Sequence, residues 1–156
     1  MAAGTWKIYT RAKRLMCSTS INLNTGVYKM CLCTTAASAN ILKVSNGGIS
    51  TWASVGSEIS ARGGYAANGR TIPNGPKWTV GASTKQMKWT YTATGIVFTA
   101  SNSPLNNVRY AVIRNSTGTN AGKVLCFCTL STAQFTITSP NTLTILPAAT
   151  GVFTLA

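Results

Sequence analysis

The sequence predicts a mainly β protein: a single β-sandwich or jelly-roll-like domain with a short N-terminal helix. Charged residues supply only 10% of the chain, against about a quarter in ordinary globular proteins, so Thr, Ser, Asn and Gly must form much of the surface. β-branched and aromatic residues, which favour strands, are frequent. After Ile21, short apolar or alternating runs are cut by Gly, Asn, Pro and Ser, which is typical of many strands joined by turns.

A short amphipathic helix is predicted over about residues 5–17. Four apolar side chains recur there at helical spacing: Ile8, Ala12, Leu15 and Met16. Lys7, Arg11 and Arg14 lie along another face of the same helix. A basic face of this kind is either simply solvated or contacts an acidic neighbour.

Short strands are predicted along the rest of the chain, over about residues 21–156, with no second helix of useful length. They cover residues 27–34, 70–72, 77–80, 85–91, 95–100, 108–114, 123–130, 134–138, 142–146 and 152–155. Such a density of short strands indicates a sandwich or jelly roll. Residues 45–68, rich in Gly and Ser with Trp52 and Tyr65 among them, are predicted to form a long structured loop. No change of composition marks a boundary, so residues 1–156 are expected to form one domain.

Charge is the most unusual feature of the composition. Fourteen Lys and Arg residues face one acidic residue, Glu58, which gives a net charge of +13 and an isoelectric point near 10.1. A positive field of this size attracts acidic proteins, nucleic acids and anionic membranes. Apart from residues 7–14 the cations are dispersed, and no Lys/Arg tract of the kind that binds nucleic acid or lipid occurs. A basic tail is therefore not expected; a membrane is not an expected partner, and nucleic acid is a disfavoured one.

Targeting segments are not evident. Residues 1–20 hold no apolar run of signal-peptide length, and no stretch approaches the roughly 18 apolar residues that a membrane span needs. Synthesis as a soluble product in the cytoplasm is expected.

The residue inventory excludes most catalytic chemistry. With no histidine and one carboxylate, the chain cannot assemble paired acids, a Ser/His/Asp triad, a Cys/His dyad or a histidine metal site. No enzymatic activity, cofactor or metal is therefore expected, and Glu58 is predicted to pair with a nearby cation. Trp78, Trp89 and Tyr110 alternate as strand residues do, which favours core packing over stacking on bases.

The five cysteines leave three interpretations open. Cys31 with Cys33 and Cys126 with Cys128 occupy alternate positions of predicted strands, so each pair points to one sheet face. They are reduced core residues, a zinc site of four thiolates, or partners in disulfides within or between subunits. The sulfurs of a Cys-x-Cys strand stand about 6–7 Å apart, wider than a zinc knuckle provides. Cys17 is the odd thiol, which could bridge two chains.

Several segments in order resemble small accessory structural proteins of tailed bacteriophages. These are the basic N-terminal helix, the strand entry 22–34 (NLNTGVYKMCLCT), the loop at Gly64 and Tyr65 with residues 69–71, the strand 108–113 (VRYAVI) and the terminus 151–155 (GVFTL). The resemblance covers nearly the whole chain, and the Arg-Tyr-Ala-Val-Ile strand is its most specific element. The chain differs from the family at Asn22, Asn24 and Thr25, where other members carry acidic residues, and it has more cysteines.

The resemblance implies a virion protein with a β-sandwich core, made in the host cytoplasm and located on the capsid exterior. Its implied role is that of a decoration or cement protein, a homotrimer that binds the acidic outer surface of the major capsid protein and stabilises the head. Lys7, Arg11, Arg14 and Arg62 are the expected partner contacts. A tail, collar or fibre-base component is the alternative within the phage interpretation, and a basic nucleic-acid-binding module is the alternative from another class.

Overall fold

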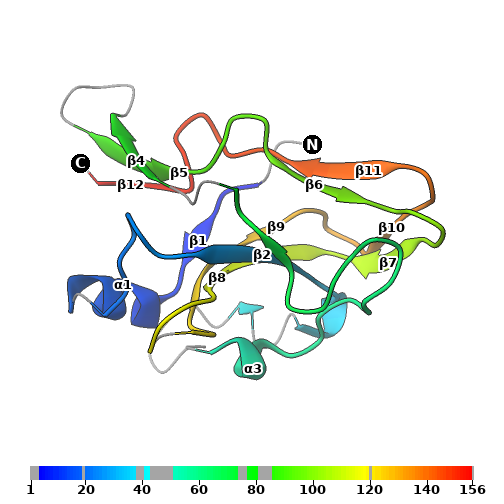
Figure 1. Cartoon of the computed structure of the whole chain (residues 1–156), viewed down its shortest axis with the longest axis horizontal. Helices are drawn as coiled ribbons and strands as arrows, with labels where there is room; N and C mark the ends of the chain where they lie inside the picture. The colour runs from blue at the N-terminus through cyan, green and yellow to red at the C-terminus, as the bar shows by residue number, and fades with distance from the viewer. Residues whose placement is uncertain are drawn as a thin grey trace.

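A computed structural model of the chain describes residues 4–18, 20–37, 41–42, 51–73, 77–80, 86–119 and 121–155. The mainly β prediction is confirmed: every named strand pairs antiparallel to a neighbour, and a short helix lies near the N-terminus (Figure 1). Because antiparallel strands are joined by tight turns, this architecture follows from the short runs and frequent turn residues of the sequence.

A five-stranded sheet forms the centre of the molecule. Its order is β1 (Lys7–Ile8), β9 (Val124–Thr129), β8 (Tyr110–Asn115), β2 (Tyr28–Cys33) and β3 (Arg70–Thr71). The three long strands β2, β8 and β9 are buried along nearly their whole length. A sheet covered on both faces needs apolar side chains at consecutive positions, which explains why these strands lack a polar alternation.

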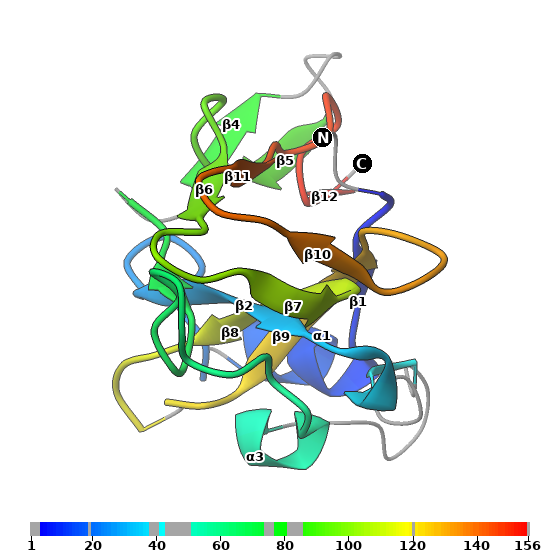
Figure 2. The ribbon, with the colours of Figure 1, turned by 90° about the vertical axis from the view of Figure 1, so that its right-hand side faces the viewer.

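Smaller sheets cover one face of the central sheet. β4 (Lys77–Val80), β5 (Met87–Thr90) and β12 (Phe153–Leu155) form one of them, and β6 (Ile96–Thr99) pairs with β11 (Thr142–Ile145). They lie above the central sheet in Figures 1 and 2. β7 (Leu105–Val108) pairs with β10 (Phe135–Ile137) and continues the β8–β9 pair, since the Leu130 N–H donates to the Arg109 carbonyl at 2.9 Å. The second layer is divided among separate sheets, and the finer assignment to a sandwich or jelly roll stays a prediction.

The main core lies between the central sheet and this second layer. It draws on buried side chains from Trp6 to Val152, so one apolar cluster includes residues from nearly the whole described chain. Trp89 is fully buried near its centre, stacked on Phe153 at 5.2 Å and edge-on to Tyr28 at 5.2 Å. Such pairs contribute about 0.5–1.5 kcal/mol beyond the burial of their area. The predicted core positions Trp89 and Tyr110 are thus confirmed, while Trp78 is only half-buried.

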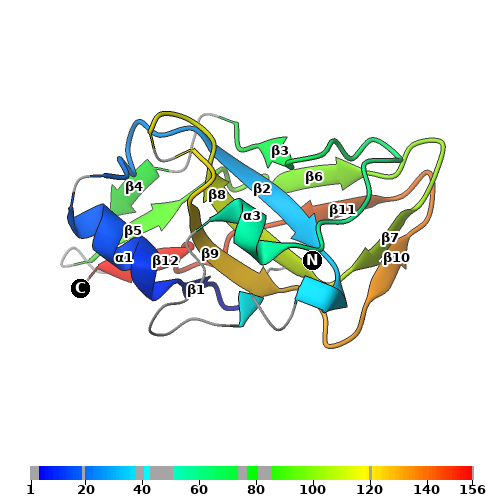
Figure 3. The same cartoon turned by 90° about the horizontal axis from the view of Figure 1, so that it is seen from below.

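Two helices cover the opposite face of the central sheet, α1 (Thr10–Cys17) and the single turn α3 (Trp52–Val55) (Figure 3). A second apolar cluster fills the space beneath them, and Tyr9, Ala12, Val55 and Phe127 are among its members. Tyr9 packs on Phe127 with ring centroids 5.4 Å apart. A short 3₁₀ turn, η1 (Thr35–Ala37), follows β2.

The observed boundaries correct the sequence prediction in three places. The helix begins at Thr10 and not near residue 5, because Lys7 and Ile8 pair with Phe127 and Cys126 as strand β1. Residues 105–107 are strand, although the sequence predicts no strand between residues 100 and 108. The predicted loop 45–68 contains α3, and its residues 45–50 lie outside the described residues. Short elements of this kind are fixed by a distant strand or surface and not by local periodicity.

Candidate functional site

Helix α1 carries the basic residues on which the sequence prediction rested. The backbone N–H of Tyr9 donates to the carbonyl of Leu125 at 3.0 Å, and Ala12 is buried, so both anchor the helix to the central sheet. Arg11, Lys13 and Arg14 are exposed. Arg14 lies in the last helical turn, where a cation interacts favourably with the partial negative charge of the carbonyl end.

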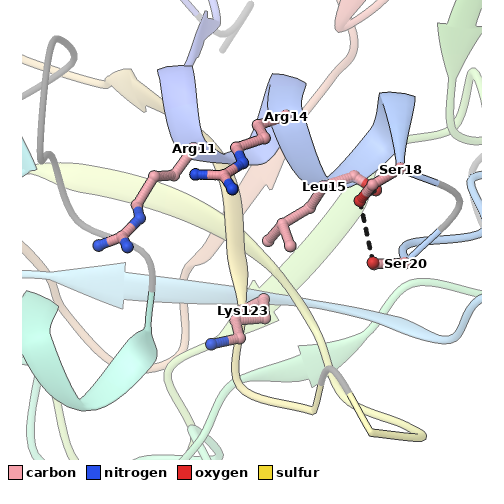
Figure 4. Close-up of a pocket in the computed structure, with 6 residues that line it drawn as sticks. All are labelled: Arg11, Arg14, Leu15, Ser18, Ser20 and Lys123. Atoms are coloured by element: carbon pink, nitrogen blue, oxygen red, sulfur yellow. Dashed lines mark hydrogen bonds between the residues drawn. The ribbon is translucent and has the colours of Figure 1, made fainter.

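A hollow of 370 Å³ lies between α1 and the start of β9, and we call it the basic pocket. Its lining residues are Arg11, Arg14, Leu15, Ser18, Ser20 and Lys123 (Figure 4). Figure 4 shows the side chains of Arg11 and Arg14 extending from α1 toward the side on which Lys123 lies. The hydroxyls of Ser18 and Ser20 are hydrogen-bonded to each other at 2.9 Å. Three cationic groups and two hydroxyls therefore surround one small hollow.

Lys123 is the pocket residue that sequence reasoning missed. Its backbone bridges to Thr51, and its carbonyl accepts a hydrogen bond of 2.8 Å from the N–H of Asn115. These contacts fix the backbone of Lys123, which lines one pocket with Arg14 although the two residues are distant in the sequence. No local pattern marks it, because its role depends on where β9 enters the sheet.

The other two predicted contacts lie outside the basic pocket. Lys7 is exposed on β1, opposite Phe127. Arg62 is exposed in the turn that bridges it to Tyr65, and the neighbouring Gly63 approaches Ser103, just before β7. The structure thus brings together Arg11 and Arg14 of the four predicted residues and leaves Lys7 and Arg62 elsewhere on the surface.

The only acidic side chain does not neutralise this pocket. Glu58 is half-buried at the end of β2, where Oε1 accepts a hydrogen bond of 2.6 Å from the hydroxyl of Tyr65. The observed partner of Glu58 is thus the phenol of Tyr65, and the predicted pairing of Glu58 with a cation stays a prediction. Within the described ranges no acidic side chain lines the basic pocket. Like charges held together without a counter-charge repel, and an anion bound between them relieves that repulsion.

The paired cysteines occupy opposite faces of the central sheet. Cys33 faces the helix-side cluster, while Cys126 and Cys128 belong to the main core. Through their partners on β8, Cys126 is in register with Met30 and Cys128 with Leu32. Because successive residues of a strand point to opposite faces, Cys31 and Cys33 point away from the face that holds Cys126 and Cys128. The sheet therefore separates the two cysteine pairs. Their four thiolates cannot bind one zinc ion, and no disulfide can join a cysteine of one pair to a cysteine of the other. Among the described residues no group of metal-ligating side chains gathers.

All five cysteines are free thiols, and four of them are buried. Burial raises the pKa of Cys31 to about 12 and that of Cys128 to about 12, and it raises the pKa of Cys33 and Cys126 as well. These thiols are protonated at neutral pH, whereas the thiolate is the reactive and metal-binding form. The four buried cysteines are reduced core residues, the first of the three interpretations given for them. Cys17 is exposed on α1, and a bridge through it to another chain stays a prediction.

Two arginines contribute to structure and not to the basic pocket. Arg114 is only 9% exposed; it donates to the carbonyl of Asn68 at 3.1 Å and lies over the Trp52 ring at 5.7 Å. Arg109 donates to the Thr35 hydroxyl at 3.3 Å and lies over the ring of Tyr110. Cation–π contacts of this kind contribute about 0.5–2 kcal/mol, depending on burial.

The basic pocket presents the donors of two arginines, one lysine and two serine hydroxyls. Arginine donors match the geometry of carboxylate and phosphate oxygens, and lysine adds a point charge. None of the described helices is long and apolar enough to cross a membrane. Comparison of the chain with protein-family models, with curated proteins and with solved structures found no match.

Proposed function

We propose that the chain is a structural protein of a tailed-phage virion, a capsid decoration or cement protein that binds the acidic outer surface of the capsid lattice and stabilises the head. One observation carries the proposal: the basic pocket gathers Arg11, Arg14 and Lys123, while the only acidic side chain is hydrogen-bonded elsewhere to Tyr65. A surface with this uncompensated charge selects an anionic partner.

A binding role without catalysis also agrees with the few titratable side chains that the chain contains. The chain has no histidine, its one carboxylate accepts a phenol hydrogen bond, and its buried thiols are protonated. A general acid or base needs a poised titratable group within reach of substrate. The described residues supply cations and hydroxyls in their place, which suits a structural role.

Multivalency makes weak individual contacts sufficient for such a role. Exposed ion pairs contribute only about 0–1 kcal/mol each. On a repeating shell, a homotrimer presents its pocket to several identical lattice surfaces at once, which raises avidity by orders of magnitude without new contacts. The proposed partners are accordingly the major capsid protein and further copies of this chain.

Nucleic-acid binding is the second candidate, and the net charge of +13 is the observation in its favour. Against it, Trp6 and Trp89 are buried, which leaves two of the four tryptophan rings unable to stack on bases as single-strand binders require.

The test is the copy number and position of the protein in purified particles of its phage, measured by quantitative gel electrophoresis and cryo-electron microscopy on one preparation. Copies at every equivalent position of the icosahedral shell support the proposal. A few copies at the vertex or tail contradict it in favour of a collar or tail component. Absence from the particles, with binding to DNA that weakens steeply as salt rises, favours the nucleic-acid-binding module.

A further inference from the structure

A second hollow of 560 Å³ lies on the other flank of α1, and we call it the apolar groove. Its lining residues are Ile8, Lys13, Met16, Cys17, Leu23, Trp78, Phe153 and Thr154. A neighbouring hollow of 300 Å³ shares Met16, Leu23 and Trp78 with it. The two hollows together run from β1 and β12 along α1 to the segment before β2.

Several of the side chains that line the apolar groove are large and only half-buried. Trp78 and Phe153 meet edge to face with centroids 5.5 Å apart, and both rings retain exposed surface. Met16 faces them from α1. Half-exposed aromatic side chains beside a flexible methionine are typical of surfaces that seat apolar anchors of a partner.

Strands at the ends of their sheets border the apolar groove. β1 ends the five-stranded sheet and β12 ends the three-stranded sheet, and their residues Ile8 and Phe153 both line the groove. In the part of the chain that the structure describes, β1 pairs only with β9 and β12 only with β5. A sheet edge of this kind can accept hydrogen bonds from an added extended segment.

Charge indicates which occupant fits. Lys13 lies at the apolar groove, and Arg11 and Arg14 line the basic pocket on the opposite flank of the same helix. A second copy seated in this groove would need carboxylates to face Lys13, and the chain has a single acidic residue, Glu58, which is hydrogen-bonded to Tyr65. A segment that combines carboxylates with large apolar side chains is attracted.

We propose that the apolar groove binds an extended acidic segment of the partner protein, which places an aromatic or aliphatic side chain against Trp78 and Phe153 while its carboxylates face Lys13 and the basic pocket. The segment thus lies across α1. The proposal rests on the acidic partner of the proposed function and adds an apolar anchor to it. Charge sets the attraction, and the anchor adds short-range specificity.

Cys17 provides a direct probe because it lines the apolar groove and is exposed, whereas the other four thiols are buried. The test measures the rate of maleimide labelling of Cys17 in the full chain with a short, blocked peptide that alternates Glu with Phe. We expect this peptide at saturation to slow labelling about tenfold, as an occluding anchor would. A peptide with Ala in place of Phe is expected to protect much less.

Two matched variants locate the binding. Thr154→Glu places a carboxylate at the apolar groove, whereas Thr142→Glu makes the same change at an exposed position of β11. We expect Thr154→Glu to abolish protection of Cys17 and Thr142→Glu to leave it unchanged. Thermal unfolding of both variants checks that each is folded. Labelling of the parent chain with a peptide that has Gln in place of Glu tests whether protection needs the carboxylates.

The outcomes separate the two proposals. Equal protection by the Phe and Ala peptides, or protection that survives Thr154→Glu but is lost in Arg14→Gln, overturns the apolar groove while acidic binding stands. Failure of every acidic peptide to bind overturns both the apolar groove and the acidic partner. Concentration-dependent dimerisation that buries Cys17 without peptide shows that the occupant is a second copy, which also overturns this proposal.

Discussion

The hydroxyl of Tyr65 donates a 2.6 Å hydrogen bond to Glu58 and accepts one of 3.0 Å from the buried N–H of Leu32. The single acidic side chain of the protein is thereby joined to Leu32, the penultimate residue of β2. This hydrogen bond engages Glu58 away from the basic pocket, which no acidic side chain of the described residues lines. Burial raises the pKa of Tyr65, so its hydroxyl remains a donor over the whole neutral range.

Tyr65→Phe is expected to lower the free energy of unfolding by about 1–3 kcal/mol, because the N–H of Leu32 loses its acceptor inside the protein. Glu58→Gln keeps an oxygen that can accept from Tyr65 and should cost much less. Urea denaturation of the two variants and the parent measures both. A larger loss for Glu58→Gln than for Tyr65→Phe would contradict this assignment.

Lys123→Gln and Arg14→Gln are each expected to weaken binding of an acidic partner or peptide by about 0.5–1 kcal/mol, roughly two- to fivefold, because each removes one cation from the basic pocket. Stability should stay within about 0.5 kcal/mol or rise slightly, since like charges are relieved. Binding is measured by titration calorimetry at about 0.15 M salt, where the screening length is about 8 Å.

Arg62→Gln is the matched control for these variants, as an exposed arginine outside the basic pocket. It should leave affinity nearly unchanged. An effect as large as that of Arg14→Gln would show that the partner surface extends beyond the pocket to the residues first predicted from the sequence.

Stability is expected to fall as pH rises above about 8.5, the usual pKa of a cysteine in an unfolded chain. Because burial raises the pKa of Cys31 and Cys128 to about 12, the unfolded state loses these protons first and is favoured as pH increases. The stabilisation is fully present below pH 8.5 and is lost between there and pH 12, at up to about 1.4 kcal/mol per pH unit and thiol.

Urea midpoints at several pH values from neutral to alkaline measure this dependence, and Cys31→Ala should make it shallower. The raised pKa values of Tyr28 and Tyr91 act in the same direction above about pH 10. A stability that does not change between neutral pH and pH 10 would contradict the buried, protonated thiols.

Gly69→Ala is expected to destabilise the fold by about 2–4 kcal/mol. Gly69 has φ of +78°, and an added Cβ would lie 2.4 Å from the Met30 carbonyl oxygen and 2.5 Å from the Cys31 sulfur. Gly118→Ala is the matched control, with φ of +70° and no atom within 4 Å of the added Cβ, and should cost about 1–2 kcal/mol. Thermal unfolding compares them; equal losses would contradict the steric argument.

Much of the secondary structure could be predicted from local pattern. Ten of the eleven named strands after α1 are covered over most of their length by predicted runs that include apolar or β-branched residues, and Lys77–Val80 has the predicted bounds. Leu105–Val108 was recognised only at its last residue, because Asn106 and Asn107 interrupt the apolar pattern. Lys7–Ile8 was assigned to the helix, because two residues satisfy a helical period as well as a strand pairing.

The sequence by itself determined the mainly β composition, the excess of cations and the absence of histidine chemistry, because these depend on residue types and local alternation. Only the tertiary structure decided that the two cysteine pairs lie on opposite sheet faces, that Glu58 binds Tyr65, and that Lys123 joins Arg11 and Arg14. Alternation along a strand determines which of its residues point to the same face of the sheet. Which residues of different strands lie together on that face depends on the order and register of the strands. Long-range pairing therefore created the candidate site.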